Sequence, residues 1–296
     1  MLGVRRVVSL LSARGVVSLL ANRGGASPLA TRGASLLSTR ATAPEIVQFP
    51  ALKDNYGFLL HDPATGATAA VDTPEVAPLV AVLQSKGWTL THILNTHHHA
   101  DHCGGNVDLK RFYPGLQVVA PAAESAKIRG GVDVAVQGGD VFRFGEVDIE
   151  TIEVGGHTLG HVAYHVPAAA ACFVGDAIFA LGCGRMFEGS YSQFWASLGR
   201  IQQLPDATAL YCAHEYTAAN ARFALSIEPG NAALVARVAD ITKMRAAGEP
   251  TVPTTLALER ATNPFIRPAA VRAALGLGEM ADVDVFAELR KRKDTF

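Results

Sequence analysis

The chain has 296 residues, of which 49% are hydrophobic and 18% are charged. This composition is typical of a globular protein that forms one large domain or two modest ones. No uninterrupted apolar run reaches the roughly 20 residues that a membrane-spanning helix needs, so we expect no membrane partner.

The first 42 residues differ from the rest of the chain in composition. They contain six arginines and six serines but no Asp, Glu or Lys. Such a segment is typical of a transit peptide, so we expect residues 1–42 to be disordered and to direct the chain to the mitochondrial matrix. A plastid destination, or a disordered tail without a targeting role, is the alternative. Beyond this segment, 20 of the 26 Lys and Arg residues stand against 27 Asp and Glu, a net charge of about −7 that argues against a nucleic-acid partner.

Short apolar or alternating runs predict β-strands through residues 43–215. The predicted strands cover residues 46–49, 57–60, 69–72, 92–95, 117–120, 147–154, 162–166, 171–175 and 209–213. A helix is predicted to begin near Pro74 and to end near Gly87. Strands mixed with helices predict a layered α/β architecture in which sheets lie between helices.

The pattern becomes helical after Tyr216. Helices are predicted over residues 218–226, 232–247 and 283–293. Asn231 is a candidate N-cap of the middle helix, and Gly248 is a candidate stop. Residues 248–268 are richer in Pro and Thr, so we expect them to cross the surface. The sequence therefore predicts a smaller, mostly helical domain over residues 216–296.

Four side chains that can bind a metal fall within six positions of one predicted loop. They follow the predicted strand 92–95 and precede two glycines, and they are His97, His99, Asp101 and His102. Imidazoles and carboxylates are ligands that proteins use for zinc and iron. A solvated histidine tract is the alternative, but a strand that ends in a tight loop favours a metal site.

Three other predicted strands each end next to a possible ligand, namely His157, Asp176 and His214. Strand ends can converge along one edge of a sheet, where α/β proteins usually place their sites. An isolated His or Asp at a strand end is more often structural, but these three accompany the loop cluster. Five imidazoles and two carboxylates exceed the four ligands of one tetrahedral ion. We therefore predict two ions that share a bridging carboxylate and a bridging water.

With these motifs the chain resembles the metallo-β-lactamase superfamily, whose hallmark is the His-x-His-x-Asp-His element. Within that superfamily it is most similar to glyoxalase II, the hydroxyacylglutathione hydrolases. The motifs that carry this narrower resemblance lie at residues 53–56, 95–99, 156–161, 182–185, 214–217, 263–265 and 290–294. The resemblance covers about residues 45–296. It implies an α/β fold with a metallo-β-lactamase-like αββα sandwich over 43–215, followed by a smaller helical, glutathione-binding domain over 216–296.

The resemblance also implies which side chains hold which ion. The ligands of one ion are His97, His99 and His157, and those of the other are Asp101, His102 and His214. Asp176 bridges the two ions, and Asp101 also orients the bridging hydroxide. Zinc is the expected metal, although iron and manganese accept the same ligand types. The resemblance implies no ligand role for His98, His161 or His165.

The residues alone predict metal-assisted hydrolysis of an acyl compound, because two ions about 3.5–4 Å apart bind a shared water and lower its pKa towards about 7. The resemblance narrows this to the hydrolysis of S-D-lactoylglutathione to D-lactate and glutathione, the second step of methylglyoxal detoxification. It also implies that the substrate contacts Arg185, Phe187, Tyr216, Arg290 and Lys293. Phe187 stands where some members carry Tyr, and Arg185 where others carry Lys. For Arg290 and Lys293 the alternative is that they only offset a helix dipole.

Three other functions are compatible with parts of this pattern. A glutathione persulfide dioxygenase of the same fold needs only two histidines and one carboxylate around a single iron, so the complete second ligand set argues against it. A nucleic-acid-processing hydrolase would need a basic surface, which the acidic chain after residue 42 does not predict. A non-catalytic scaffold would have no use for a complete ligand set. We expect a monomer whose partner is a small-molecule glutathione thioester.

Overall fold

The computed structural model describes residues 43–296 of the chain. The predicted transit peptide, residues 1–42, lies outside the described residues. Of the helices that are described, none has the length and apolar character needed to cross a membrane.

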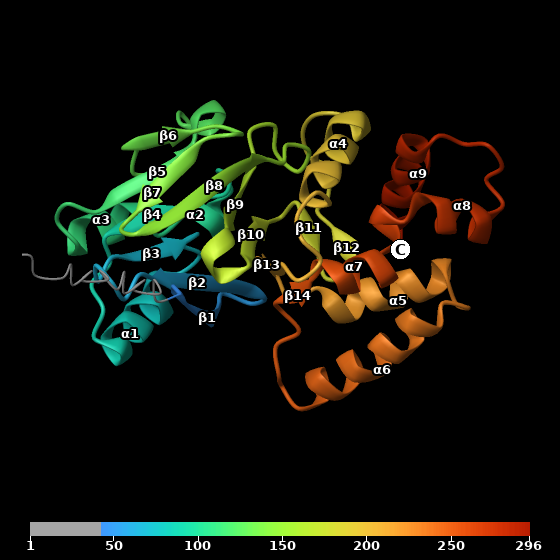
Figure 1. Cartoon of the computed structure of the whole chain (residues 1–296), viewed down its shortest axis with the longest axis horizontal. Helices are drawn as coiled ribbons and strands as arrows, with labels where there is room; N and C mark the ends of the chain where they lie inside the picture. Colours follow the sequence, from blue (N-terminus) through green and yellow to red (C-terminus); the bar gives the residue numbers. More distant parts are fainter. Residues whose placement is uncertain (1–42) are drawn as a thin grey trace, which may run out of the picture. The chain divides into compact units, whose positions relative to one another are not determined.

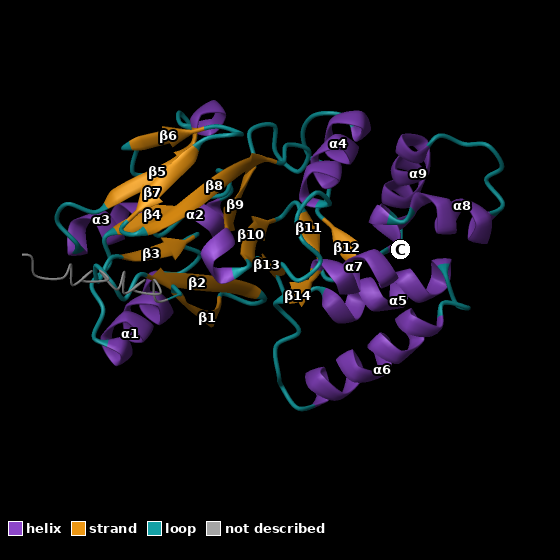
Figure 2. Cartoon of the chain, viewed as in Figure 1, coloured by secondary structure: helices purple, strands orange, loops and turns teal. Residues whose placement is uncertain are grey.

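The first of two six-stranded sheets is mixed, with the strand order β1-β2-β3-β4-β5-β6 (Figure 2). Its strands are β1 (Glu45–Ala51), β2 (Asn55–His61), β3 (Thr68–Val71), β4 (His92–Leu94), β5 (Gln117–Pro121) and β6 (Val134–Val136). Strands β1 to β3 pair antiparallel, whereas β3 to β6 pair parallel. Parallel neighbours need long crossovers, and here α1 (Val76–Lys86) and α3 (Asn106–Phe112) provide the first two. The third, between β5 and β6, contains only the 3₁₀ turn Ala122–Glu124.

The second sheet has the strand order β14-β13-β10-β9-β8-β7, and only β10 and β13 pair parallel. Its strands are β7 (Val141–Phe144), β8 (Val147–Glu153), β9 (Val162–Val166), β10 (Ala171–Gly175), β13 (Ala209–Cys212) and β14 (Thr254–Thr255). A separate two-stranded ribbon, β11 (Ile178–Phe179) with β12 (Gly182–Cys183), follows β10 in the chain.

The facing sides of the two sheets share one hydrophobic core. Phe58 of β2 contacts Phe173 of β10 and Tyr211 of β13, with ring centroids 5.5 and 5.4 Å apart. The other face of the first sheet packs against α1 and α3 through Leu79 and Leu109. Helix α4 (Tyr191–Ile201) packs against β8 of the second sheet. The order helix, sheet, sheet, helix confirms the predicted αββα sandwich (Figure 1).

The C-terminal part is helical, as predicted. Its helices are α5 (Thr217–Ile227), α6 (Ala232–Ala246), α7 (Leu256–Thr262), α8 (Pro268–Leu275) and α9 (Asp282–Asp294). Asn231 caps α6, because its side chain accepts a hydrogen bond from the Leu234 N–H. Helices α5, α6 and α9 correspond to the three predicted helices.

The structure corrects the prediction for residues 248–268. This stretch contains β14, α7 and a 3₁₀ turn, and Leu256 and Phe265 are almost fully buried. Glu259 of α7 is also buried, because its carboxylate accepts hydrogen bonds from Arg237 (2.5 Å) and from the Leu181 N–H (2.9 Å). The prediction of a surface crossing was wrong because Pro and Thr here begin and cap short elements that pack inward.

Candidate metal centre

The predicted ligands lie where strands end and loops begin. Residues 97–102 occupy the loop after β4 and the short helix α2 (Ala100–Cys103), and His157 lies in the loop between β8 and β9. Asp176 follows β10 directly, and His214 follows β13. These side chains form two groups, and within each group the ligand atoms lie within 4.8 Å of one another. We call His97, His99 and His157 the first cluster, and Asp101, His102 and His214 the second cluster. A third such group, His97, His102 and Asp176, joins them.

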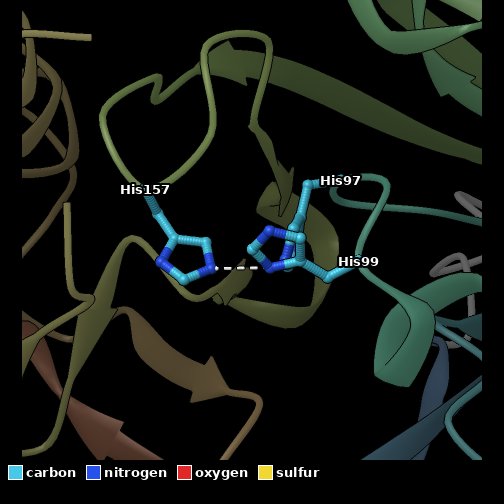
Figure 3. Close-up of side chains that lie close together, drawn as sticks. All are labelled: His97, His99 and His157. Atoms are coloured by element: carbon cyan, nitrogen blue, oxygen red, sulfur yellow. Dashed lines mark hydrogen bonds between the residues drawn. The ribbon is translucent and has the colours of Figure 1, made fainter. Parts of the chain in front are cut away.

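The first cluster consists of three imidazoles with no carboxylate among them (Figure 3). His99 Nδ1 and His157 Nε2 lie 3.0 Å apart. The fully buried His97 ring is edge-on to both of their rings, with centroids 4.7 and 5.0 Å away. Burial lowers the pKa of all three imidazoles, and the neighbouring histidines lower that of His97 further. They are therefore neutral near pH 7 and offer lone pairs to a cation.

The second cluster combines two imidazoles with a carboxylate. Asp101 Oδ2 lies 3.4 Å from His214 Nε2 and 3.5 Å from His102 Nε2. Burial alone would lower the pKa of His214, but hydrogen bonds to Asp101 and Asp176 raise it to about 10. Burial likewise opposes charge on His102, but Asp176 and Asp72 raise its pKa above the usual value. Without a metal, the His214 imidazole holds a proton at neutral pH that a cation would have to displace, and the carboxylates around His102 favour its protonated form as well.

Asp176 lies between the two clusters. Its Oδ1 is 3.5 Å from both His102 Nε2 and His214 Nε2, and its Oδ2 is 3.3 Å from His157 Nε2. Burial would raise the pKa of this carboxyl, but the charges of His102 and His214 hold it well below its usual range. Asp176 is therefore an ionised carboxylate with one oxygen directed at each cluster.

Two further carboxylates fix the imidazoles of the second cluster. His102 Nδ1–H donates to Asp72 Oδ2 at 2.8 Å, and His214 Nδ1–H donates to Asp54 Oδ1 at 2.9 Å. Because each Nδ1 is engaged in this way, each Nε2 is directed at the centre of the cluster. A carboxylate behind a ligating histidine orients the ring and raises its basicity.

Neutral acceptors fix the imidazoles of the first cluster. His157 Nδ1–H donates to the backbone carbonyl of Arg185 at 2.8 Å. His97 Nδ1–H donates to the Thr96 hydroxyl at 3.0 Å, and that hydroxyl in turn donates to Asp72 Oδ2 at 2.8 Å. The Nε2 lone pair of His97 is consequently left for a ligand, while that of His157 is directed at the centre of the cluster, where it faces His99 Nδ1.

The donor set fits two cations. Among the described residues, three buried atoms of the cluster have no hydrogen-bond partner, namely His97 Nε2, His102 Nε2 and Asp176 Oδ1. Buried polar atoms without a partner are costly, so atoms directed at a common point indicate a bound group. Nitrogen and carboxylate oxygen in this number suit two divalent ions.

Asp54, Asn55 and Asp72 also support the centre, although the sequence reasoning did not identify them. Asn55 Nδ2 donates to Asp101 Oδ2 at 3.1 Å, which restrains that carboxylate. Asp72 follows strand β3, so it carries the same strand-end signal as Asp176. Asp54 and Asn55 lie within the motif at residues 53–56, one of those that carry the resemblance.

A cavity of about 560 Å³ opens onto the two clusters. Of the predicted substrate residues, Arg185, Phe187 and Tyr216 line it. Tyr216 stacks on His214 with ring centroids 4.7 Å apart, and the Phe187 ring lies 5.2 Å from that of His157. The cavity is also lined by Phe179, which the sequence reasoning missed.

Arg290 and Lys293 lie outside the residues that line this cavity. Arg290 is 5% exposed; its guanidinium donates to the carbonyl of Cys183 (2.9 Å) and to Asp294 (2.9 Å). The Lys293 ammonium lies 5.2 Å from the centre of the Phe223 ring. Arg290 thus supports the loop that carries Arg185, and direct contact of either residue with a substrate stays a prediction.

The three histidines for which the resemblance implies no ligand role, His98, His161 and His165, lie outside the three groups of ligand atoms. His98 pairs with Glu124, and His165 pairs with Glu150. His161 is fully buried, and its Nε2 accepts a hydrogen bond from the Asp176 backbone N–H at 3.1 Å.

Comparisons with known proteins place the chain in a family. Residues 57–214 match the family model "Metallo-beta-lactamase superfamily", and residues 215–296 match "Hydroxyacylglutathione hydrolase C-terminus". A hydroxyacylglutathione hydrolase of Methylococcus capsulatus is 53% identical over 254 residues, which cover 85% of this chain and 98% of the relative. The chain belongs to the hydroxyacylglutathione hydrolase family. A second member, from Erythrobacter litoralis, is 54% identical over 85% of this chain and 99% of its own length.

Solved structures agree on the fold. A crystal structure of BLEG-1 B3 metallo-β-lactamase aligns with a TM-score of 0.59 at 19% identity, covering 75% of this chain and 99% of that one. The chain is thus a hydrolase family member with a metallo-β-lactamase fold and a His/Asp centre that is compatible with two metal ions.

Proposed function

We propose that this chain hydrolyses S-D-lactoylglutathione, and related S-2-hydroxyacylglutathiones, to the free hydroxy acid and glutathione. The observation that carries the proposal is the position of Asp176, which lines the cavity and whose two oxygens face two separate ligand clusters. None of the described residues that line this cavity is Ser, Thr or Cys, so the site offers no side-chain nucleophile of those types. The relatives named above support the glutathione thioester as substrate.

The first cluster would hold one divalent ion and the second cluster the other, with Asp176 shared between them. Zinc suits these ligands best, and iron or manganese suits them as well. When bound, such a pair lowers the pKa of a shared water towards about 7 and polarises the substrate carbonyl.

The carboxylate of Asp101 orients the attacking water. Burial would raise the pKa of this carboxyl, but the hydrogen bond with His214 and the charge of His102 hold it well below its usual range. The ionised group can therefore accept a hydrogen bond from the water at neutral pH. The Asn55 amide donates to Asp101 Oδ2 and so restrains this carboxylate. The carboxylate would in turn hold the water in one orientation relative to the acyl carbon.

Three side chains around the mouth of the cavity suit the rest of the substrate. Arg185 has a side chain that is 59% exposed, so its guanidinium can pair with a glutathione carboxylate. Tyr216 stacks on His214 and lines the cavity. Phe187, 60% exposed, offers an apolar wall beside His157. Arg290 and Lys293 of α9 would complete the glutathione site when substrate is bound.

We also infer a division of labour along the chain. Residues 43–215 would supply the catalytic centre, and residues 216–296 would supply part of the glutathione site. The two family models, which meet between residues 214 and 215, support this boundary. The chain would act as a monomer. Size-exclusion chromatography with light scattering tests this, and we expect a mass near 31 kDa, or a lower mass if residues 1–42 are removed.

For residues 1–42 we propose a mitochondrial targeting role, with a plastid as the other organelle that the composition allows. Support comes from the six arginines and the absence of acidic residues alone, since the relatives named above are bacterial. A fluorescent protein that carries residues 1–42 at its N-terminus should enter mitochondria, and diffuse fluorescence would refute the proposal.

The proposed activity is tested with purified protein that lacks residues 1–42. Loss of the thioester absorbance of S-D-lactoylglutathione is followed while oxygen is monitored in the same cuvette. Thioester hydrolysis without oxygen uptake is expected. Oxygen uptake with glutathione persulfide, together with a single bound iron and no hydrolysis, would instead identify a dioxygenase of the same fold.

A further inference from the structure

Glu124 is a buried carboxylate that neither belongs to the two clusters nor lines their cavity. It ends a 3₁₀ turn, residues 122–124, that directly follows β5, and only 2% of its surface is exposed. A buried carboxylate is stabilised only by partners that replace the water it has lost. The partners of Glu124 therefore indicate what it does.

Those partners come from two ligand-bearing loops. Oε2 accepts hydrogen bonds from the backbone N–H and from Nδ1–H of His98, both at 2.8 Å. Oε1 accepts one from the backbone N–H of Gly160 at 2.9 Å. His98 lies between the ligands His97 and His99, and Gly160 lies three residues after His157. One carboxylate thus joins the loop that supplies two ligands of the first cluster to the loop that supplies the third.

The packing at Gly160 indicates that this connection is a close one. A Cβ atom at position 160 would lie 2.7 Å from Glu124 Cγ and 2.8 Å from Ala123 Cβ. Real side chains do not approach so closely, so the loop after His157 can meet the turn only because residue 160 is glycine. The two ligand loops are consequently held against the same turn.

We propose that Glu124 is a positioning residue of the first cluster: it sets the distance between the His97–His99 loop and the His157 loop, and so the affinity of that cluster for its metal ion. The proposal rests on the proposed function only in that it assumes a metal bound at the first cluster. Glu124 acts through the hydrogen bonds that it accepts from backbone and imidazole N–H groups, and it contacts neither the metal ion nor the substrate.

The first test is Glu124→Gln. Glutamine has the same size, but only one of its two terminal atoms can accept, so the amide NH₂ must face the donors of either His98 or Gly160. The N–H groups of one loop then lose their acceptor and face the N–H groups of the glutamine amide instead. Outer-sphere changes of this kind typically cost about 10–100-fold in metal affinity, and we expect that loss for one of the two ions. The other ion should keep its wild-type affinity.

The measurement is a Zn²⁺ titration of the metal-free protein against a chromophoric chelator, without substrate. We expect Glu124→Gln to retain one tight ion where the wild type retains two, and the thermal midpoint of the metal-free protein to change little. With S-D-lactoylglutathione, kcat should fall while KM stays within about twofold, because the substrate contacts are untouched. A purely structural role would lower the thermal midpoint without separating the two ions.

Glu150→Gln is the matched control. Glu150 also accepts a hydrogen bond from an imidazole, His165 Nδ1, at the same 2.8 Å, but its side chain is half exposed and joins no ligand loops. This variant should bind both ions with wild-type affinity.

Should Glu124→Gln fail to fold, two variants at His98 test the same connection, because they change the hydrogen bond from His98 Nδ1–H to Glu124. His98→Ala removes the imidazole donor and should weaken one ion by about tenfold. His98→Asn places an amide N–H near the position of Nδ1–H and should restore most of that affinity. Wild-type Zn²⁺ affinity for both ions in Glu124→Gln, or in His98→Ala, overturns the proposal. Because Zn²⁺ binding is measured without substrate, a wild-type chain that binds two ions but does not cleave the thioester refutes the proposed function alone.

Discussion

The two ligand clusters differ in what stands behind their imidazoles. In the first cluster the outer ring nitrogens of His97 and His157 donate to a hydroxyl and a backbone carbonyl, and burial keeps the rings neutral. In the second cluster the outer ring nitrogens donate to carboxylates, and further carboxylates face the inner nitrogens, so the pKa values of both rings are raised. Similar ligands thus acquire opposite electrostatic character from their surroundings.

The two clusters therefore differ in which groups offset the charge of a bound ion. A divalent ion in the first cluster meets three neutral imidazoles, and Asp176 is the carboxylate nearest to them that can offset its charge. An ion in the second cluster meets Asp101 and Asp176, with Asp54 and Asp72 behind the rings. The second ion is better compensated but must displace protons, whereas the first is bound by preformed lone pairs. Three predictions test this contrast, and a fourth concerns substrate residues outside both clusters.

The largest effect is expected for Asp176→Asn, which removes the group common to both clusters. An amide cannot present an anionic oxygen to each side, so we expect at least one ion to be lost and turnover to fall by more than the roughly 100-fold typical of outer-sphere changes. Metal content and thioester hydrolysis, measured on one sample, check this. Full activity with two ions retained would refute the bridging role.

The second prediction concerns pH and separates the clusters. The pKa of His214 is raised to about 10, so this imidazole is protonated at pH 7 in the metal-free protein, and the pKa of His102 is raised as well. The first-cluster imidazoles have lowered pKa values and are already neutral there. From pH 7 to 9, Zn²⁺ affinity at the second cluster should therefore rise about tenfold per pH unit for each displaced proton, while that of the first cluster stays nearly constant. Calorimetry in buffers of different ionisation enthalpy counts the released protons, and equal release at both clusters would contradict the contrast.

The third prediction removes one carboxylate behind a ring. Asp54→Asn should weaken the ion of the second cluster by about 10–100-fold and leave that of the first unchanged. Asp62→Asn is the matched control, since Asp62 accepts hydrogen bonds from Thr65 and from the Glu146 N–H away from the centre. The control should lose stability without changing the affinity for either ion. Loss of both ions in Asp54→Asn would mean that the clusters are not independent.

The smallest effects are expected at the substrate residues, which leave both clusters intact. Arg185→Ala should raise KM for glutathione thioesters about tenfold, because one charge-assisted hydrogen bond to the substrate is lost. The decrease in kcat should be smaller than this increase in KM. Arg290→Ala should also raise KM more than it lowers kcat. Arg292 lies on the same helix but pairs with Glu288 at the surface, so Arg292→Ala should behave as wild type. An unchanged KM in Arg290→Ala would leave that residue only its contacts with Cys183 and Asp294.

The sequence predicted the sandwich and the ligand candidates because their signals are local. Strands 162–166 and 171–175 are apolar runs whose predicted bounds agree with β9 and β10, and the second of them ends next to Asp176. Short strands such as β6 and β14 were not predicted, since two or three residues carry little pattern. The carboxylates Asp54, Asp72 and Glu124 were missed for another reason: their partners lie 26 to 160 residues away. Asp72 stands at a strand end as Asp176 does, but that signal does not tell a ligand from a residue that orients one.

The central claim is that two ions, one in each cluster, are required together. Metal-free protein is titrated with Zn²⁺, and the rate of S-D-lactoylglutathione hydrolysis is measured at each ratio of ions to chain. We predict that activity reaches its plateau only near two ions per chain. Full activity at one ion per chain, or none at two, would contradict the account.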